Sequence, residues 1–220
     1  MSLFQFIFFS SLEYFGSFLF VLVQFRFSLR ENISKIILIS ILLSFVSYSF
    51  INNDLGAISP LIQNLIFLIY IQVALKVSVT NSIIMVLTGY IAFGLVQTCI
   101  IAAASHVGLI VLETLEAATS TAYILQTCSF IMISILSFLT YFFKGGFSFI
   151  EARSRFSKNS LTGKNKGFIV YILIAFVVTL FSNLTLLKSD NPPYLLIASV
   201  LMLTLVIHVY MTLRRDETND

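Results

Sequence analysis

The sequence predicts an all-α fold, a polytopic membrane protein with seven transmembrane helices. The chain is 58% hydrophobic and only 10% charged, with a mean hydropathy of +0.99, whereas about a quarter of the residues of soluble proteins are charged. Crossing a bilayer core about 30 Å thick takes roughly 20 apolar residues per helix. Because 220 residues hold seven such helices and short loops, we expect one transmembrane domain over residues 1–220.

Charged or turn-forming residues separate the first four apolar stretches. The first stretch stops at the basic segment 26–35, and the second stops at the polar turn 52–56. The third begins through Pro60, a residue tolerated in a first helical turn, and the fourth follows Lys76 after a short connection. We therefore predict helices over residues 3–25, 36–51, 58–77 and 82–104.

The remaining stretches are bounded in the same way. The fifth ends at Lys144, where the long basic loop 144–166 begins. The sixth and seventh are separated by the turn 188–193, whose Ser, Asp, Asn and Pro residues are typical of turns. We predict helices over residues 121–143, 167–187 and 194–213. The semi-polar segment 105–120 either extends the fourth helix outward or lies as an interfacial helix on the membrane surface.

The basic residues indicate the orientation of the chain. If seven helices alternate in direction, all of the thirteen Lys and Arg residues except Lys188 lie on one side of the membrane. Basic loops stay in the cytoplasm, so we expect the N-terminus outside, the C-terminus in the cytoplasm and a multi-pass protein of the bacterial plasma membrane. Since these charges flank membrane segments, they do not indicate binding to nucleic acid.

Glu13 is the most informative polar residue because it lies near the midpoint of the first helix. A carboxylate there is costly and usually faces the interior of the bundle. It is either a ligand-contacting or proton-titrating switch, or a hydrogen-bonded group that joins its helix to a neighbour. Gln97 and His208 lie at similar depths, so we name Glu13, Gln97 and His208 as a candidate ligand or proton switch. A lone His can also hydrogen-bond within the bundle without such a role.

Other polar residues gather toward the predicted outer end. They could line an outward-facing cavity, although Glu113 and Glu116, three residues apart on one helix face, are also typical of a solvated surface. The candidates for this outer polar face are Gln63, Asn64, His106, Glu113, Glu116 and Asn183.

The loop 144–166 alternates Phe with basic residues. Such a pattern is typical of a basic amphipathic segment that contacts anionic lipid headgroups or a cytoplasmic partner. Its alternative interpretation is charge that only sets topology. The candidate contact residues are Arg153, Arg155, Lys158, Lys164 and Lys166.

Known catalytic motifs are absent from the sequence. We find no H-E-x-x-H zinc motif, no G-x-S-x-G nucleophile turn and no phosphate-binding loop. Cys99 and Cys128 both fall inside predicted helices and read as small packing residues. We therefore predict a protein that is not an enzyme and that has no metal and no cofactor.

The seven-pass plan of about 200 residues resembles the membrane sensor half of bacterial peptide-pheromone histidine kinases. The run Ser11–Gly16 and the basic turn Arg26–Ile33 also resemble uncharacterised polytopic membrane proteins of Gram-positive bacteria. The kinase part is absent and His208 is intramembrane, so kinase activity is not carried over. What the resemblance implies is a sensing or binding module that acts through a partner.

Three functions follow from these observations. We expect a module that binds or senses a small hydrophobic or peptide ligand, with the lipid bilayer and a cytoplasmic or membrane protein as partners. The first alternative is a transporter or permease component in which Glu13 titrates. The second is an immunity or accessory membrane protein.

Overall fold

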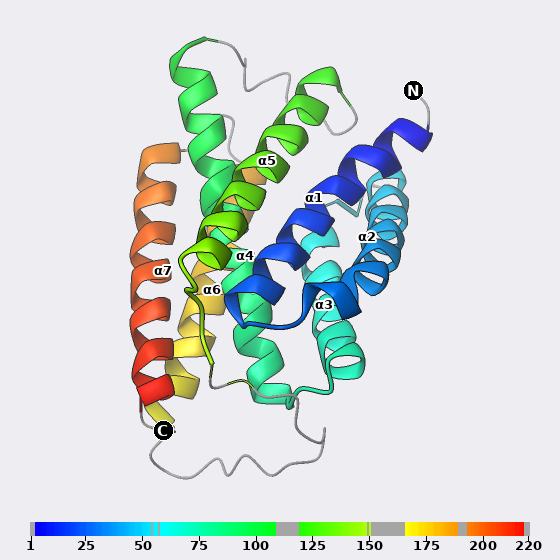
Figure 1. Ribbon diagram of the computed structural model, residues 1–220. Helices are drawn as coiled ribbons and strands as arrows, with labels where there is room; N and C mark the ends of the chain where they lie inside the picture. Colours follow the sequence, from blue (N-terminus) through cyan, green and yellow to red (C-terminus); the bar gives the residue numbers. More distant parts are fainter. Residues whose placement is uncertain are drawn as a thin grey trace.

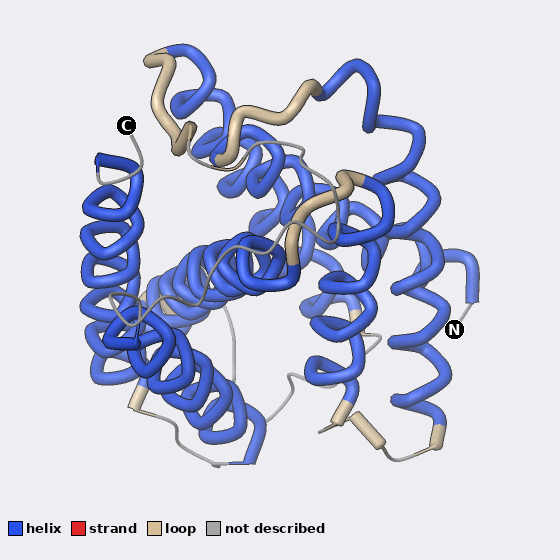
Figure 2. The backbone as a smooth tube through the Cα atoms, turned by 90° about the horizontal axis from the view of Figure 1, so that it is seen from below, coloured by secondary structure: helices blue, strands red, loops and turns tan. Residues whose placement is uncertain are grey.

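The computed structural model describes residues 3–53, 55–56, 58–108, 119–148, 150, 166–188 and 193–217, with the backbone alone described for 166–169, 183–184, 186–188 and 215–217. These residues form helices and no strand (Figures 1 and 2). The seven helices of the described residues are α1 (Leu3–Gln24), α2 (Leu29–Asn52), α3 (Ser59–Ala74), α4 (Val79–His106), α5 (Ser120–Phe142), α6 (Lys166–Lys188) and α7 (Tyr194–Glu217).

Five of these helices, α1, α2, α4, α5 and α7, are long and apolar enough to cross a membrane. Helix α3 is apolar but has only 16 residues, which is about 24 Å of helix. Large hydrophobic side chains cover the outer surface, among them Phe142 at 66% exposure and Leu195 at 80%. An apolar exterior of this kind belongs in lipid, so the expected class of helical membrane protein is confirmed, while the number of spans and their orientation stay predictions.

The largest difference from the predicted helix bounds is at the start of α2, which begins at Leu29 rather than at residue 36. Ser28 is the extended N-cap residue, Glu31 lies in the first turn, and Asn32 Nδ2 donates to the Ser28 carbonyl oxygen at 2.8 Å. An acidic residue in a first turn is favourable because it complements the helix dipole. The charged residues that suggested a loop therefore belong to a helix that projects past its apolar part.

The other bounds move less. Helix α3 begins at Ser59 and ends at Ala74, shorter than the predicted 58–77, whereas α4 covers 79–106 and α7 continues to Glu217. Lys76 explains the early end of α3, because its φ of +55° is incompatible with a right-handed helix.

Helix α4 is the centre of the bundle and contacts α1, α3, α5, α6 and α7, while α1 packs between α2 and α5. Two glycines allow the closest approaches. A Cβ atom at Gly16 would lie 2.7 Å from Ile133 of α5, and one at Gly89 of α4 would lie 2.6 Å from Val21 of α1. These contacts place the middle of α1 directly against α4 and α5.

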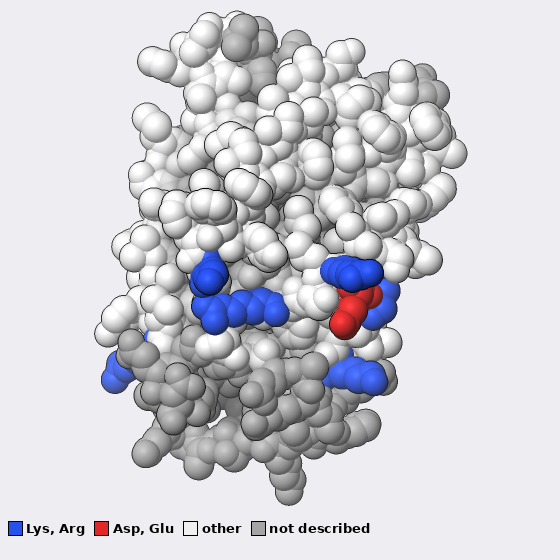
Figure 3. All heavy atoms as spheres, in the orientation of Figure 1, with Lys and Arg blue, Asp and Glu red and all other residues white. Residues whose placement is uncertain are grey.

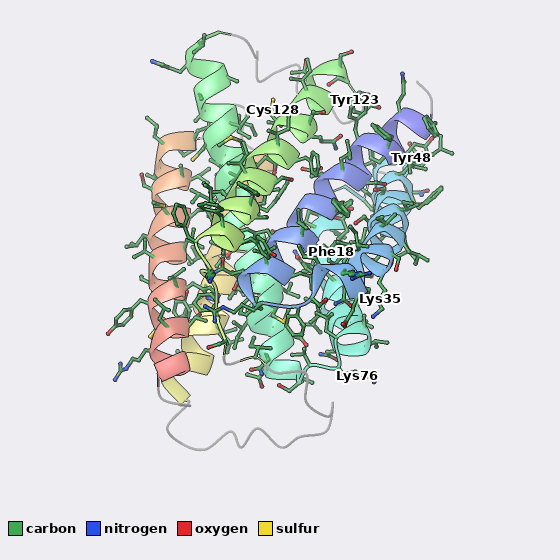
Figure 4. All side chains as sticks on the ribbon, viewed as in Figure 1. Phe18, Lys35, Tyr48, Lys76, Tyr123 and Cys128 are labelled. Carbon is green, nitrogen blue, oxygen red and sulfur yellow. The ribbon has the colours of Figure 1, made fainter. Side chains whose placement is uncertain are left out.

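Successive helices run in opposite directions, so α1 begins at the upper end of the bundle and α7 ends at the lower end (Figure 1). The described Lys and Arg side chains visible on the face shown in Figure 3 all lie in the lower half, and Figure 4 places Lys35 and Lys76 there, opposite Tyr123 and Cys128. The bundle thus has one basic end and one end that carries little charge on this face.

Three helices finish at the lower end with a basic residue in the left-handed conformation. Arg26, Lys76 and Lys144 follow α1, α3 and α5 with φ of 54°, 55° and 52°. After α5, the backbone N–H of Lys144 donates to Tyr141 and that of Gly145 to Thr140, the pattern of a Schellman cap. Glycine is the usual residue in this position, so a charged residue in each of the three is a departure from the rule.

The segment after α5 crosses the end of α1 and contacts Arg26. We call this arrangement the α1–α5 clasp; it comprises Arg26, Gly145, Gly146 and Phe147. The Arg26 guanidinium donates to the carbonyl oxygens of Lys144 at 2.9 Å and Gly145 at 3.3 Å. The Phe147 N–H donates to the Gln24 carbonyl oxygen at 2.7 Å, and its buried ring lies 5.3 Å from that of Phe25. Gly146, with φ of 93°, is the bend that makes this approach possible.

Candidate functional site

A pocket of about 200 Å³ lies between the first four helices. Its lining residues come from the middle of α1, the first half of α3 and the middle and later part of α4, so it lies at the middle to upper level of the bundle, away from the basic end. The residues that line it are Glu13, Tyr14, Ser17, Phe18, Leu43, Pro60, Gln63, Asn64, Phe67, Tyr90, Phe93, Gly94 and Gln97.

Glu13 is the acidic group of this pocket. Gln97 Nε2 of α4 donates to Glu13 Oε1 at 3.4 Å, which is longer than a typical N–H···O bond. Gln126 of α5 donates to the Ser10 hydroxyl oxygen of α1 at 3.3 Å, about one turn before Glu13. The Gln97 amide thus joins the carboxyl group to α4, and the half-buried Glu13 side chain lines the pocket.

Gln63 and Asn64 occupy the first turns of α3, next to Pro60. The Asn64 amide donates to the Pro60 carbonyl oxygen at 2.9 Å, and the Gln63 amide donates to the Ser59 hydroxyl oxygen at 2.6 Å. Both N–H₂ groups thus satisfy backbone or side-chain acceptors at the start of their own helix. The carbonyl oxygen and the second N–H of each amide remain for a ligand.

Aromatic rings form much of the pocket wall. Phe18 of α1 (Figure 4) packs edge-on against Phe67 of α3 with ring centroids 4.1 Å apart, and against Tyr70 at 5.3 Å. Sequence reasoning did not single out the five rings that line the pocket, because aromatic residues in apolar helices are indistinguishable there from lipid-facing ones. Those rings belong to Tyr14, Phe18, Phe67, Tyr90 and Phe93.

His208 is separated from Glu13 and Gln97, although we grouped the three in the candidate switch. It is fully buried on α7, where its Nε2 lies 2.7 Å from the hydroxyl oxygen of Thr88. Thr88 precedes Gln97 by nine residues, which is about 14 Å along α4 and half a turn around it. His208 is therefore not part of the pocket that Glu13 and Gln97 line, and a functional link between His208 and Glu13 stays a prediction.

The Thr88 contact indicates which nitrogen of His208 carries a proton. The Thr88 hydroxyl also lies 2.8 Å from the Ile84 carbonyl oxygen, to which its single proton is donated. Its oxygen is then left to accept from His208 Nε2–H. Nδ1 is buried and has no hydrogen-bond partner among the described residues.

The remaining predicted site residues do not join the pocket or fall outside what the structure describes. His106 is an exposed residue at the end of α4 and is not part of the pocket lining. Lys166 begins α6 and Asn183 lies within it, but their side chains are not described. The other predicted site residues, which lie outside the described residues, are Glu113, Glu116, Arg153, Arg155, Lys158 and Lys164.

Cysteine and metal chemistry adds no further site to the part of the chain that the structure describes. Cys99 and Cys128 are both free thiols. No group of three or more His, Cys, Asp or Glu side chains that could hold a metal ion occurs within those residues. The pocket at Glu13 is therefore the best-defined candidate site.

Comparison with known proteins gives no relative of this chain. No protein-family model matches it, and neither a curated protein nor a solved structure does.

Proposed function

We propose that the chain is a non-enzymatic, multi-pass protein of the plasma membrane with seven spans, its N-terminus outside and its C-terminus in the cytoplasm, and that it binds a small ligand from the outer face. The observation that carries this proposal is the convergence of Glu13, Gln97, Gln63 and Asn64 on one pocket. These four polar residues come from three different helices, α1, α3 and α4, and they line the same pocket.

The size of the pocket narrows the ligand. An apolar cavity of about 150 Å³ holds one benzene molecule, so 200 Å³ accommodates a small molecule or a single side chain of a peptide. A whole peptide does not fit. A small ligand is therefore favoured over a peptide, and the effect of binding on the cell would pass through a protein partner.

Access from the outer face follows from the proposed orientation. The pocket lies toward the end of the bundle where α1 and α3 begin, and the described Lys and Arg side chains on the face shown in Figure 3 lie in the other half. The positive-inside rule assigns the basic end to the cytoplasm. A ligand that enters beside Gln63 and Asn64 thus comes from outside the cell.

Orientation is tested by cysteine-accessibility labelling in a variant whose Cys99 and Cys128 are replaced by Ser. A cysteine introduced at Asn53 should react with a membrane-impermeant maleimide in intact cells, and one at Lys35 only after the membrane is opened. Both positions are exposed, at opposite ends of α2, so each controls for the other. Labelling of Lys35→Cys but not Asn53→Cys in intact cells would reverse the proposed orientation.

Ligand binding is tested by purifying the protein from its native membrane and identifying co-purified small molecules by mass spectrometry. Asn64→Phe places a ring in the pocket, whereas the control Ser199→Phe adds the same bulk to an exposed site on α7. A compound that accompanies the wild type and Ser199→Phe, but is depleted in Asn64→Phe, is the expected result. Equal amounts of every compound in all three proteins would contradict the proposal.

A further inference from the structure

We propose that the pocket takes a small organic cation, a primary to quaternary ammonium group that lies against the Glu13 carboxylate and the surrounding aromatic rings. This inference rests on the proposed ligand-binding function and adds the charge and chemical class of the ligand.

The balance of charge in the pocket is the first reason. Of the thirteen lining residues, Glu13 is the single acidic one and none is Lys or Arg. No ion pair to Glu13 occurs among the described residues, and Arg26, the next basic residue along the chain, lies thirteen positions away, which is about 20 Å along the helix. A charged carboxylate at such a depth is costly, and a cationic ligand would compensate that charge.

The hydrogen-bonding groups of the pocket favour a donor ligand in the same way. The amide N–H₂ groups of Gln63, Asn64 and Gln97 already donate to Ser59, Pro60 and Glu13. Their carbonyl oxygens carry partial negative charge and accept hydrogen bonds. Each amide also keeps a second N–H, but the Glu13 carboxylate and the three carbonyl oxygens together offer an ammonium group several acceptors.

The aromatic part of the wall adds a third, independent reason. Rings from α1, α3 and α4 line the pocket, and two of them, Phe18 and Phe67, pack against each other. The faces of aromatic rings attract organic cations, most strongly when water is excluded, and cages of such rings recognise quaternary ammonium groups. A bare metal ion would gain little from this wall, because hard cations require several oxygen ligands.

Choline and its uncharged isostere 3,3-dimethylbutan-1-ol form a matched pair of probes, since they differ by N⁺ in place of carbon. Both are smaller than the pocket. Binding to the full-length protein is measured by isothermal titration calorimetry in dodecyl maltoside, which contains no ammonium group to compete. The wild type should bind choline about tenfold more tightly than the isostere, a ratio in the range expected of desolvated cation–π and carboxylate contacts.

Two pairs of variants locate the effect. Glu13→Gln keeps the shape of the side chain and should abolish the preference for choline, whereas Glu31→Gln removes an exposed carboxylate of α2 and should preserve it. Phe93→Leu should weaken choline binding several-fold, whereas Phe142→Leu, on the exposed face of α5, should not. Unchanged far-ultraviolet circular dichroism and gel-filtration profiles check the folding of each variant.

The outcomes separate this inference from the proposed function. Equal or tighter binding of the isostere, or a preference for choline that survives Glu13→Gln, would overturn the cationic class and leave the pocket as a binding site. Failure of both probes to bind would also overturn it. The co-purification comparison of Asn64→Phe with Ser199→Phe would then decide on its own whether the pocket binds a ligand.

Discussion

The α1–α5 clasp depends on Gly146, and Gly146→Ala should destabilise the protein more than a glycine-to-alanine change at any other described glycine outside the helices. At φ of 93°, Gly146 occupies a region that side chains with a Cβ atom rarely adopt, and the added Cβ would lie 2.5 Å from the Gln24 carbonyl oxygen. That oxygen is the acceptor for the Phe147 N–H. The segment must therefore move, and the buried Phe147 ring must move with it.

The expected cost has two parts. A Cβ-bearing residue in such a conformation costs about 1–3 kcal/mol, and loss of the Phe147–Gln24 hydrogen bond adds about 0.5–1.5 kcal/mol. A loss of about 2–4 kcal/mol in the free energy of unfolding follows. The assay is reversible unfolding in mixed micelles, titrated with sodium dodecyl sulfate and followed by circular dichroism.

Alanine substitutions at two other glycines distinguish the cost of backbone strain from the cost of the close contact with Gln24. Gly108 has φ of 73° but open space around its added Cβ, so Gly108→Ala should cost only the conformational part. Gly56 has open space as well and no positive φ, and Gly56→Ala should be neutral or slightly stabilising. If Gly146→Ala and Gly108→Ala lose the same free energy, the contact with Gln24 contributes nothing and the reasoning about the clasp is refuted.

Two further predictions concern helix packing. Gly16→Ala should lower the free energy of unfolding by about 1–3 kcal/mol, because the added methyl group overpacks against α5. The better helix propensity of Ala offsets part of this loss. Gly94→Ala is the control and should not destabilise, since the atom nearest to its added Cβ lies 3.9 Å away. Thr88→Val removes the one acceptor of His208 and should cost about 1–3 kcal/mol, measured by the same titration. Thr98→Val loses a bond within its own helix alone, so an equal loss there would contradict the role of the pair.

The helical class was predictable because it depends on composition and on the length of the apolar stretches. The start of α2 was not predicted, because Arg30, Glu31 and Lys35 suggested a loop. The signal was nevertheless present: Ser28 followed by Glu31 is the spacing of a capping box, although the Ser28 side chain makes no capping bond here. Charge marks the edge of the membrane, and a helix can continue beyond it.

The candidate site was predictable only in part. Glu13 stood out because an intramembrane carboxylate is rare, and Gln97 was paired with it by depth alone. Depth in the membrane could not distinguish Gln97 from His208. It does not say that Gln97 lies on the side of α4 that faces Glu13, whereas His208 packs against Thr88 on another side of α4. The rings of Tyr90 and Phe93 carried no signal at all, because only the packing of helices distinguishes a pocket wall from a lipid-facing surface.

The three basic residues that follow α1, α3 and α5 each have two effects, on where a helix ends and on which side of the membrane its loop lies. Arg26, Lys76 and Lys144 each break a helix by their backbone conformation, and under the proposed threading each also retains its loop on the cytoplasmic side during insertion. Replacement by glycine would preserve the first effect and delete the second, while replacement by a strong helix former such as alanine would weaken both. Helix length and sidedness are therefore encoded by the same three residues: a change to glycine would separate the two properties, whereas a change to alanine would alter both.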